Sequence, residues 1–274
     1  MTGKKELQNI FLETCDFLKN TNHYFENLES MVRWTKFYKK TPHLDTSEYQ
    51  DYQTKITVEN KDTFDKVKEQ TNPKKWAVLN MASFKFPGGG VLGGSRSQEE
   101  ELCRRSTLIK SLYQFQDNED LLDLVGLSEC TKKIYPLPMY SGIYSPGVEI
   151  FRNSVSYSIL DTPIQTNIIS VSALSHPQID SQTGMMTSKD TTIMKGKIRA
   201  IFRIALLNHK ENLVLGAFGC GAYGCPPKQV AELFKSILQE KEFSCKFKEI
   251  CFAIIEDKNS KGKNYKTFKN ILQS

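Results

Sequence analysis

The chain has 274 residues, of which 39% are hydrophobic and 25% are charged, a balance typical of a globular protein that fits one large α/β domain. No apolar run approaches the roughly 20 residues of a membrane helix, so we expect no membrane partner. Residues 1–6 lack the apolar segment of a signal peptide, which favours an intracellular protein, cytoplasmic or nuclear. The formal net charge of +6 favours acidic partners such as nucleic acid or another polyphosphate, and lysines gather near the C-terminus: Lys258, Lys261, Lys263, Lys266 and Lys269.

The cysteines and histidines exclude two further classes of site. The seven cysteines are odd in number, scattered and without a CxxC pair, which predicts reduced thiols and an intracellular compartment. The four histidines show no metal-ligand spacing, so we expect no zinc site: His23, His43, His176 and His209.

The N-terminal part of the chain reads as helical. Apolar residues recur at helical spacing from residue 4 to about 40, in two stretches that divide near Asn22. We expect residues 1–50 to form a helical cover packed on the main domain, with residues 41–51 as a loop. Residues 51–274 then form that domain as one continuous globular unit.

Strands and helices alternate through the rest of the chain. We expect loops and edge strands at 134–160 and a polar loop at 175–188. The predicted strands are a short one at Ile56 and Val58, then 76–80, 166–174, 212–215 and 250–255; the predicted helices are 61–71, 98–116, 119–126, 189–207, one beginning at Pro227, and 265–272. This alternation predicts a three-layer α/β/α fold with a mixed central sheet.

The first glycine-rich loop joins the strand at 76–80 to an acidic helix start. Glycines reach positive φ, so the backbone N–H groups of Gly88–Gly90 could form an anion nest for a diphosphate. Carboxylates follow this loop, with Ser97 as the expected N-cap. Helical neighbours are about 100° apart, so Glu99, Glu100 and Glu101 cannot all face one ligand, and we expect one to point to solvent.

A second glycine-rich loop follows the strand at 212–215. Residues Gly219–Gly224 match the dinucleotide fingerprint G-x-G-x-x-G, which keeps a nicotinamide or flavin oxidoreductase as an alternative. That fingerprint normally opens the first βαβ unit, whereas here one clear strand follows it. Both loops follow strands and precede helices, so they are expected to line one cleft at the carboxyl ends of those strands.

The first loop carries a family resemblance. Gly88-Gly89-Gly90, seven residues and then Gln98-Glu99-Glu100 resembles the motif of the poly(ADP-ribose) glycohydrolases. Further blocks resemble the compact microbial branch of that family, and the resemblance runs from about residue 10 to the end: 78–83, 102–106, 144–146, 151–152 and 215–221.

The resemblance implies a macrodomain that binds ADP-ribose and cuts the ribose–ribose O-glycosidic bond of poly(ADP-ribose), with ADP-ribosylated proteins as substrates. It implies Glu100 as the catalytic acid/base and Glu99 as the group that holds ribose hydroxyls. Ligand contacts are implied for Asn80 at a ribose, for Gln98, for Gly88, Gly89 and Gly90 near the diphosphate-side ribose and phosphates, and for Gly219, Cys220, Gly221, Ala222 and Tyr223 around the diphosphate. No cofactor, metal or direct nucleic-acid binding is expected.

This reaction needs a proton for the leaving oxygen, and two adjacent carboxylates repel, which raises one pKa. The sequence departs from the family at Gly147, where this branch usually has an acid, and at Glu101, a third acid after the motif. Two alternatives share the same loops: an ADP-ribose-binding module without turnover, and a hydrolase of single ADP-ribose units. Cleavage at chain ends or within the polymer stays open.

Overall fold

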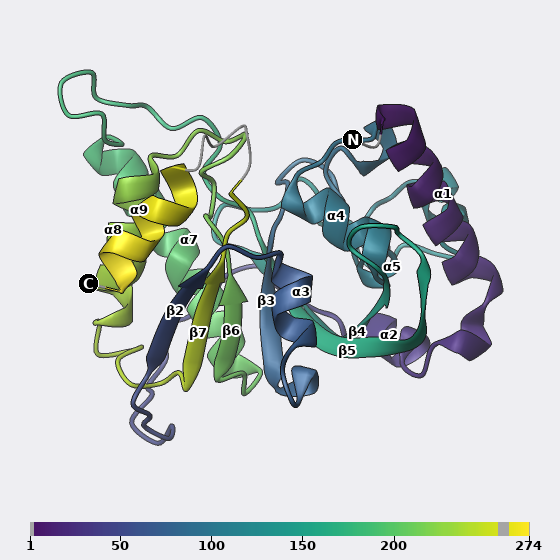
Figure 1. Ribbon diagram of the computed structural model, residues 1–274, viewed down its shortest axis with the longest axis horizontal. Helices are drawn as coiled ribbons and strands as arrows, with labels where there is room; N and C mark the ends of the chain where they lie inside the picture. Colours follow the sequence, from purple (N-terminus) through teal and green to yellow (C-terminus); the bar gives the residue numbers. More distant parts are fainter. Residues whose placement is uncertain (1–2, 257–262, 274) are drawn as a thin grey trace.

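A computed structural model describes residues 3–256 and 263–273 and places a mixed β-sheet at the centre of the chain (Figure 1). Within these residues the sheet has seven strands, in the spatial order β1 (Lys36–Tyr38), β4 (Gly142–Arg152), β5 (Ile159–Val171), β3 (Trp76–Met81), β6 (Asn212–Leu215), β7 (Glu249–Ala253) and β2 (Lys55–Glu59). The five strands from β5 to β2 run parallel, whereas β4 is antiparallel to both β5 and β1.

Helices cover both faces of the sheet (Figure 1). One face carries α7 (Ser188–Leu207), α8 (Pro227–Leu238) and α9 (Lys263–Leu272). The other carries α1 (Lys4–Asn20), α2 (Leu28–Trp34), α3 (Thr63–Lys68), α4 (Gln98–Arg105), α5 (Leu108–Tyr113) and α6 (Glu119–Leu124). The predicted three-layer α/β/α architecture is confirmed.

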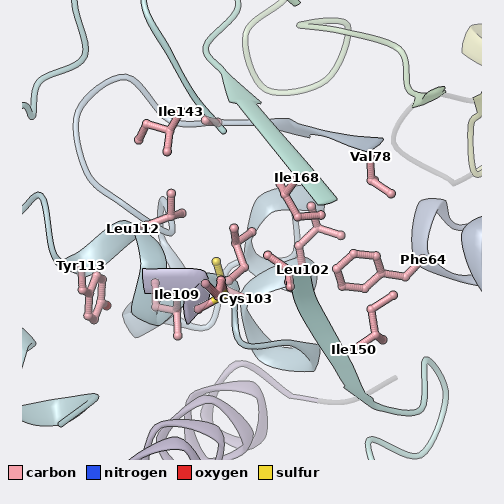
Figure 2. Close-up of a cluster of buried hydrophobic side chains, with 14 of the residues drawn as sticks. Phe64, Val78, Leu102, Cys103, Ile109, Leu112, Tyr113, Ile143, Ile150 and Ile168 are labelled. Carbon is pink, nitrogen blue, oxygen red and sulfur yellow. The ribbon is translucent and has the colours of Figure 1, made fainter. Parts of the chain in front are cut away.

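Alternation along the strands explains the two cores. Successive side chains of a strand point to opposite faces, so Val78 joins the core under α4 and α5, while Ala77 and Leu79 join the core under α7 and α8. Figure 2 shows the first core, in which Leu102 and Cys103 of α4 lie among strand residues such as Ile168. This packing fixes α4 against β3.

The N-terminal region is less helical than predicted. Helices occupy Lys4–Asn20 and Leu28–Trp34, with a short 3-10 turn at Asn22–Tyr24, but Lys36–Tyr38 form β1 and pair with β4. Phe11 and Leu18 of α1 are fully buried in the core that contains Phe151 of β4. The division at residue 50 stays a prediction.

The helix predicted at 98–116 is two helices. It breaks at Ser106 and Thr107, because Ser106 Oγ donates to the Leu102 carbonyl at 2.7 Å and the Thr107 N–H donates to the Glu149 carbonyl at 3.0 Å. Serine and threonine offer the backbone such alternatives to helical bonds. The break joins α4 to β4.

The segment 134–160 is also more regular than predicted. β4 is 11 residues long and pairs on both sides, and β5 begins at Ile159, seven residues before the predicted start of the strand. Register shifts between Ser145 and Val148 and between Ile150 and Arg152 interrupt the period-2 pattern, which hid the strand in the sequence.

The other predicted elements are confirmed, with ends that differ by a few residues: β2, β3, β6, β7, α3, α6, α7, α8 and α9. Of the C-terminal lysines, Lys258 and Lys261 lie outside the described residues, and Lys263, Lys266 and Lys269 lie on α9. None of the helices in the described ranges has the length and apolar character needed to cross a membrane.

Candidate active site

The two glycine-rich loops meet at one edge of the sheet. They follow β3 and β6, which are parallel neighbours, so both loops leave the sheet at its carboxyl edge. The Phe84 N–H in the first loop donates to the Tyr223 hydroxyl in the second at 3.3 Å. The predicted juxtaposition of the loops is therefore confirmed, and it lies at the carboxyl edge of the sheet, where parallel α/β sheets bind ligands.

Gln98 fixes the start of α4 against β3. Its Oε1 accepts from the Met81 N–H at 2.9 Å, and its Nε2 donates to the Leu79 carbonyl at 2.6 Å. These bonds occupy both ends of the amide, so in this structure Gln98 orients the helix that carries the acids.

Glu99 is held by the backbone and side chains around it. The residue is 3% exposed. Its Oε1 accepts from Asn80 Nδ2 at 3.2 Å and from the Gly88 N–H at 3.3 Å, and its Oε2 accepts from the Ser83 N–H at 2.7 Å. Three donors from β3 and the loop after it thus set the position of this carboxyl group.

The pKa of Glu99 is raised from 4.5 to about 8. Burial is the largest cause, because it removes the charged form from water, and the charge of Glu100 adds a smaller increase. The hydrogen bonds from Ser83 and Asn80 act in the opposite direction. The acid pair therefore keeps a proton near neutral pH, through burial by the protein more than through the carboxylate repulsion that the sequence suggested.

Glu100 differs from Glu99 in having one buried oxygen without a partner. The residue is 6% exposed, and its Oε1 accepts from the Gly90 N–H at 2.8 Å. Its Oε2 is buried and finds no hydrogen-bond partner among the described residues. Buried carboxylate oxygens are normally satisfied, so this atom stands out as an acceptor without a donor among the described residues.

The first glycine loop holds carboxyl groups, which differs from the predicted anion nest. The Gly88 and Gly90 N–H groups donate to Glu99 and Glu100, and the Gly89 N–H donates to the Phe86 carbonyl at 3.1 Å. A Cβ at Gly89, where φ is +59°, would lie 2.7 Å from Glu100 Oε1 and 3.0 Å from Glu99 Oε2. Glycine is therefore required at position 89, because the backbone approaches the acids closely. The amides of this loop already have acceptors within the protein, so they are not free for a diphosphate.

The second glycine loop has the free amides that the first lacks. No hydrogen bond within the described part of the chain uses the N–H groups of Gly219, Gly221, Ala222 or Tyr223. Gly219 has a φ of +76° and packs so closely on Ala173 and Cys225 that a Cβ would lie 2.8 Å from each. Successive unpaired amides in a glycine turn form an anion site. Cys220 lies in the same turn, and burial raises the pKa of its thiol.

Asn80 and Ser170 lie buried beneath the acid pair. The register of β3 and β5 places these two residues opposite one another, and Asn80 Nδ2 donates to Ser170 Oγ at 3.0 Å. The Asn80 Oδ1 atom is buried and has no partner among the described residues. Two unsatisfied acceptors, Asn80 Oδ1 and Glu100 Oε2, therefore belong to residues that flank Glu99.

Two local expectations at the helix start are wrong. Ser97 occupies the N-cap position, but its side chain makes no capping hydrogen bond. Glu101 does not extend into solvent: it accepts from Arg104 Nη1 at 2.8 Å and from the Tyr157 hydroxyl at 2.7 Å. The rotation of about 100° per helical residue does turn the Glu101 side chain away from Glu100. Its bonds to Arg104 and Tyr157 give Glu101 a role in holding the structure together.

The departure at Gly147 lies away from the acids and the two loops. Gly147 has a φ of +62° in the bulge of β4, and its N–H donates to Asn167 Oδ1 at 3.4 Å. Asn167 pairs with Ala77 near the start of β3, whereas the acids lie beyond its end. The residue therefore shapes the strand and does not line the loops.

Sequence reasoning missed Ser83 and Ser170. Ser83 donates to Glu99 through its backbone, which no residue pattern reveals, and Ser170 was visible only as a polar residue inside an apolar strand. Two open cavities lie away from the two loops. The larger, about 530 Å³, borders α7, and its Arg199 and Arg203 already pair with Glu240 and Glu242. The other, about 470 Å³, lies beside Glu101 and Arg105.

Comparisons with known proteins point to one family. The family described as "Microbial-type PARG, catalytic domain" matches residues 12–153. A poly(ADP-ribose) glycohydrolase from Thermomonospora curvata, solved with the inhibitor ADP-HPD, is 25% identical, with a TM-score of 0.76 over 97% of this chain and 99% of that chain. The Deinococcus radiodurans glycohydrolase, solved with ADP-ribose, is 25% identical, with a TM-score of 0.69 over 91% and 98%.

One curated relative also matches over a short stretch. The macro domain-containing protein VPA0103 from Vibrio parahaemolyticus is 32% identical over 53 residues, which is 19% of this chain. The match spans 31% of the length of that relative.

Proposed function

The chain belongs to the microbial-type poly(ADP-ribose) glycohydrolase family, and on that premise we propose that it hydrolyses the ribose–ribose O-glycosidic bonds of poly(ADP-ribose) and releases ADP-ribose. The observation that carries the proposal is the buried, unpartnered Oε2 of Glu100 beside a second carboxyl group that keeps its proton. This cleavage needs a carboxyl group with a free oxygen that can give a proton to the leaving oxygen and take one from water.

The second loop is the diphosphate site in this proposal. The free amides of this loop would donate to the phosphate oxygens, in the way that glycine turns bind anions. Tyr223 would pack on the ligand while its hydroxyl stays bonded to the Phe84 N–H. The amides of the first loop stay with the acids, and Gly88–Gly90 would contact the ligand through their Cα atoms.

Asn80 and Glu99 would hold the ribose whose anomeric carbon is cut. The unsatisfied Asn80 Oδ1 would accept from a ribose hydroxyl. Glu99 is already fixed by three donors, so it would meet a second hydroxyl without a change of position. A ribose held in this way presents its anomeric carbon to the next residue on the helix.

Glu100 would move the proton. In its protonated form, the Glu100 carboxyl group would donate its own proton to the leaving oxygen as the C–O bond breaks, and the bound diphosphate would stabilise the positive charge that develops on the ribose. The same carboxylate would then take a proton from the attacking water, whose oxygen bonds to the anomeric carbon. The proton balance closes at Glu100, because it gives one proton to the leaving oxygen and recovers one from the water, while Glu99 takes no part in the transfer.

Two other functions share this cleft. An ADP-ribose-binding module without turnover would need the second loop, but it gives no reason for a buried acid with an unpaired oxygen. A hydrolase of single ADP-ribose units on proteins would use the same acid with a different leaving group. We place the protein inside the cell, since all seven cysteines are free thiols, and ADP-ribosylated proteins are its proposed substrates.

The test is release of ADP-ribose from an automodified poly(ADP-ribose) polymerase. The wild-type protein should release ADP-ribose, and Glu100→Gln should lower the rate by about 10³-fold while it keeps its affinity for ADP-ribose. Glu101→Gln is the matched control on the same helix, and it should stay within about threefold of wild type. Full activity of Glu100→Gln would refute the role of this residue, and wild-type binding without release would favour the binding module.

A further inference from the structure

Two exposed side chains lie in the first loop, separated from the triple glycine by Pro87. The Phe86 ring is 59% exposed, and Lys85 beside it is also exposed. A single exposed ring is common on protein surfaces, so exposure alone does not indicate a function. The position of the ring relative to the acid pair is the relevant observation.

Phe86 is tied to the atoms that hold the acid pair. Its N–H donates to Ser83 Oγ at 3.4 Å, and its carbonyl accepts from the Gly89 N–H at 3.1 Å. The Lys85 N–H donates to the same Ser83 Oγ at 3.2 Å, while the Ser83 N–H donates to Glu99. The backbone that carries both side chains is therefore fixed relative to the catalytic carboxyl groups.

The contacts of this loop also indicate on which side of the acid pair Lys85 and Phe86 lie. Phe84 contacts both sides: its N–H donates to the Tyr223 hydroxyl of the second loop, whereas its carbonyl, on the side of Lys85, accepts from the Leu137 N–H at 2.7 Å. Residue 137 leads into β4, which lies beyond β5. The diphosphate loop follows β6, on the opposite side of β3. A ligand held at residues 219–223 and cut at Glu100 would therefore have its leaving group on the side of Lys85 and Phe86.

The chemistry of the leaving group matches these side chains. In a ribose–ribose bond of poly(ADP-ribose), the leaving oxygen belongs to the adenosine ribose of the next unit, which also bears an adenine and a phosphate. Adenine stacks on aromatic rings, and lysine attracts phosphate. We propose that Phe86 and Lys85 form a subsite for the adenine nucleotide unit on the leaving side of the scissile bond. This inference rests on the proposed function, since it assumes the polymer as substrate.

The experiment compares binding of polymer with binding of ADP-ribose, because free ADP-ribose has no leaving-side unit. Both affinities are measured in proteins that carry Glu100→Gln, because this substitution prevents turnover. Three such proteins are compared: one with the native Phe86, one with Phe86→Ala and one with Phe86→Tyr. Phe86→Ala should weaken polymer binding about tenfold and leave ADP-ribose binding within about twofold. Phe86→Tyr should restore polymer binding because it keeps an aromatic ring. Lys85→Gln should weaken polymer binding about threefold and reduce its dependence on salt.

Trp34→Ala is the control for loss of an exposed ring, since Trp34 is 62% exposed on α2. It should change neither affinity. Equal losses of polymer and ADP-ribose binding in Phe86→Ala would assign the ring to the fold of the loop and overturn the subsite. No loss of either affinity would overturn it as well.

The two proposals fail in different ways. A wild-type protein that binds polymer without releasing ADP-ribose contradicts the proposed hydrolysis, while the difference between Phe86→Ala and Phe86→Tyr still reports the subsite. Normal hydrolysis of polymer by Phe86→Ala, with unchanged kcat/KM, contradicts the subsite and leaves the hydrolase intact.

Discussion

The two glycine-rich loops look alike in sequence and do opposite things with their backbones. The first donates its amides to the protein: Gly88 to Glu99, Gly90 to Glu100 and Gly89 to the Phe86 carbonyl. The second leaves the amides of Gly219, Gly221, Ala222 and Tyr223 without a partner in the described ranges. A run of glycines near a strand end therefore predicts close backbone approach, but not whether a ligand or the protein itself receives the N–H groups.

The largest expected effect comes from the loop that holds the acids. The methyl group of Gly89→Ala would lie 2.7 Å from Glu100 Oε1, at a φ of +59° that strains any side chain. We expect kcat/KM on poly(ADP-ribose) to fall by at least about 100-fold, because a displacement of about 1 Å at the reacting groups costs that much. Gly93→Ala is the control, since its added methyl group meets nothing within 4 Å. Near-normal activity of Gly89→Ala would show that the acids are not held by this close packing.

The second loop should respond in binding. Gly219→Ala places a methyl group 2.8 Å from Ala173 Cβ and Cys225 Sγ, at a φ of +76°, and so should distort the turn of free amides. We expect the Kd for ADP-ribose, measured by calorimetry, to rise about tenfold. Gly221→Ala keeps its N–H and has open space around the new methyl group, so its Kd should rise by about twofold at most. Similar effects of the two substitutions would argue against the anion site.

The buried acid pair makes stability depend on pH. Glu99 has a pKa of about 8 in the folded protein and an ordinary value of 4.5 in the unfolded chain, so between these values the unfolded chain is ionised while the folded one keeps its proton. The folded state then binds more protons, and stability falls as pH rises from about 4.5 through 8. We expect the Tm of the wild type to drop on the order of 3–6 °C more than that of Glu99→Gln between about pH 5.5 and 8.

One outcome of the Tm measurement would contradict this prediction. Parallel Tm profiles for the wild type and Glu99→Gln over that interval would mean that Glu99 titrates at a similar pH in the folded and unfolded chains. The pKa of about 8 would then be wrong, and the pair would not retain a proton at neutral pH through Glu99.

The smallest expected effect is at the contact between the loops. Tyr223→Phe removes the acceptor of the Phe84 N–H and keeps the ring that would pack on the ligand. Loss of one such hydrogen bond costs about 1 kcal/mol, so we expect about a two- to fivefold rise in the Kd for ADP-ribose. A loss as large as that of Gly219→Ala would mean that this bond, and not the amides, organises the second loop.

The sequence predicted the parts of the site that are local in the chain. The spacing of Gly88–Gly90 from Glu99 and Glu100 singled out two acids that the structure buries against the first loop, and the order of strand, loop and helix brought the two loops to one edge. The three-layer fold followed from the alternation of apolar strands with amphipathic helices. These features depend on short-range patterns, which can be recognised without knowing which distant residues pack against them.

The rest depended on contacts between distant residues. The break of the predicted helix at Ser106 and Thr107 involves a bond to Glu149 in β4, and the partners of Glu101 include Tyr157 in the turn before β5. The allocation of the glycine amides was likewise invisible, because the same residues can serve an internal carboxylate or a bound phosphate. Only the three-dimensional arrangement decides which anion is closer.

The most direct test is a crystal structure of the Glu100→Gln protein with ADP-ribose. The account predicts the diphosphate oxygens within hydrogen-bond distance of the amides of residues 219–223, and the anomeric carbon of the distal ribose beside the side chain at position 100. A diphosphate bound to the amides of Gly88–Gly90, or an anomeric carbon far from position 100, would contradict it.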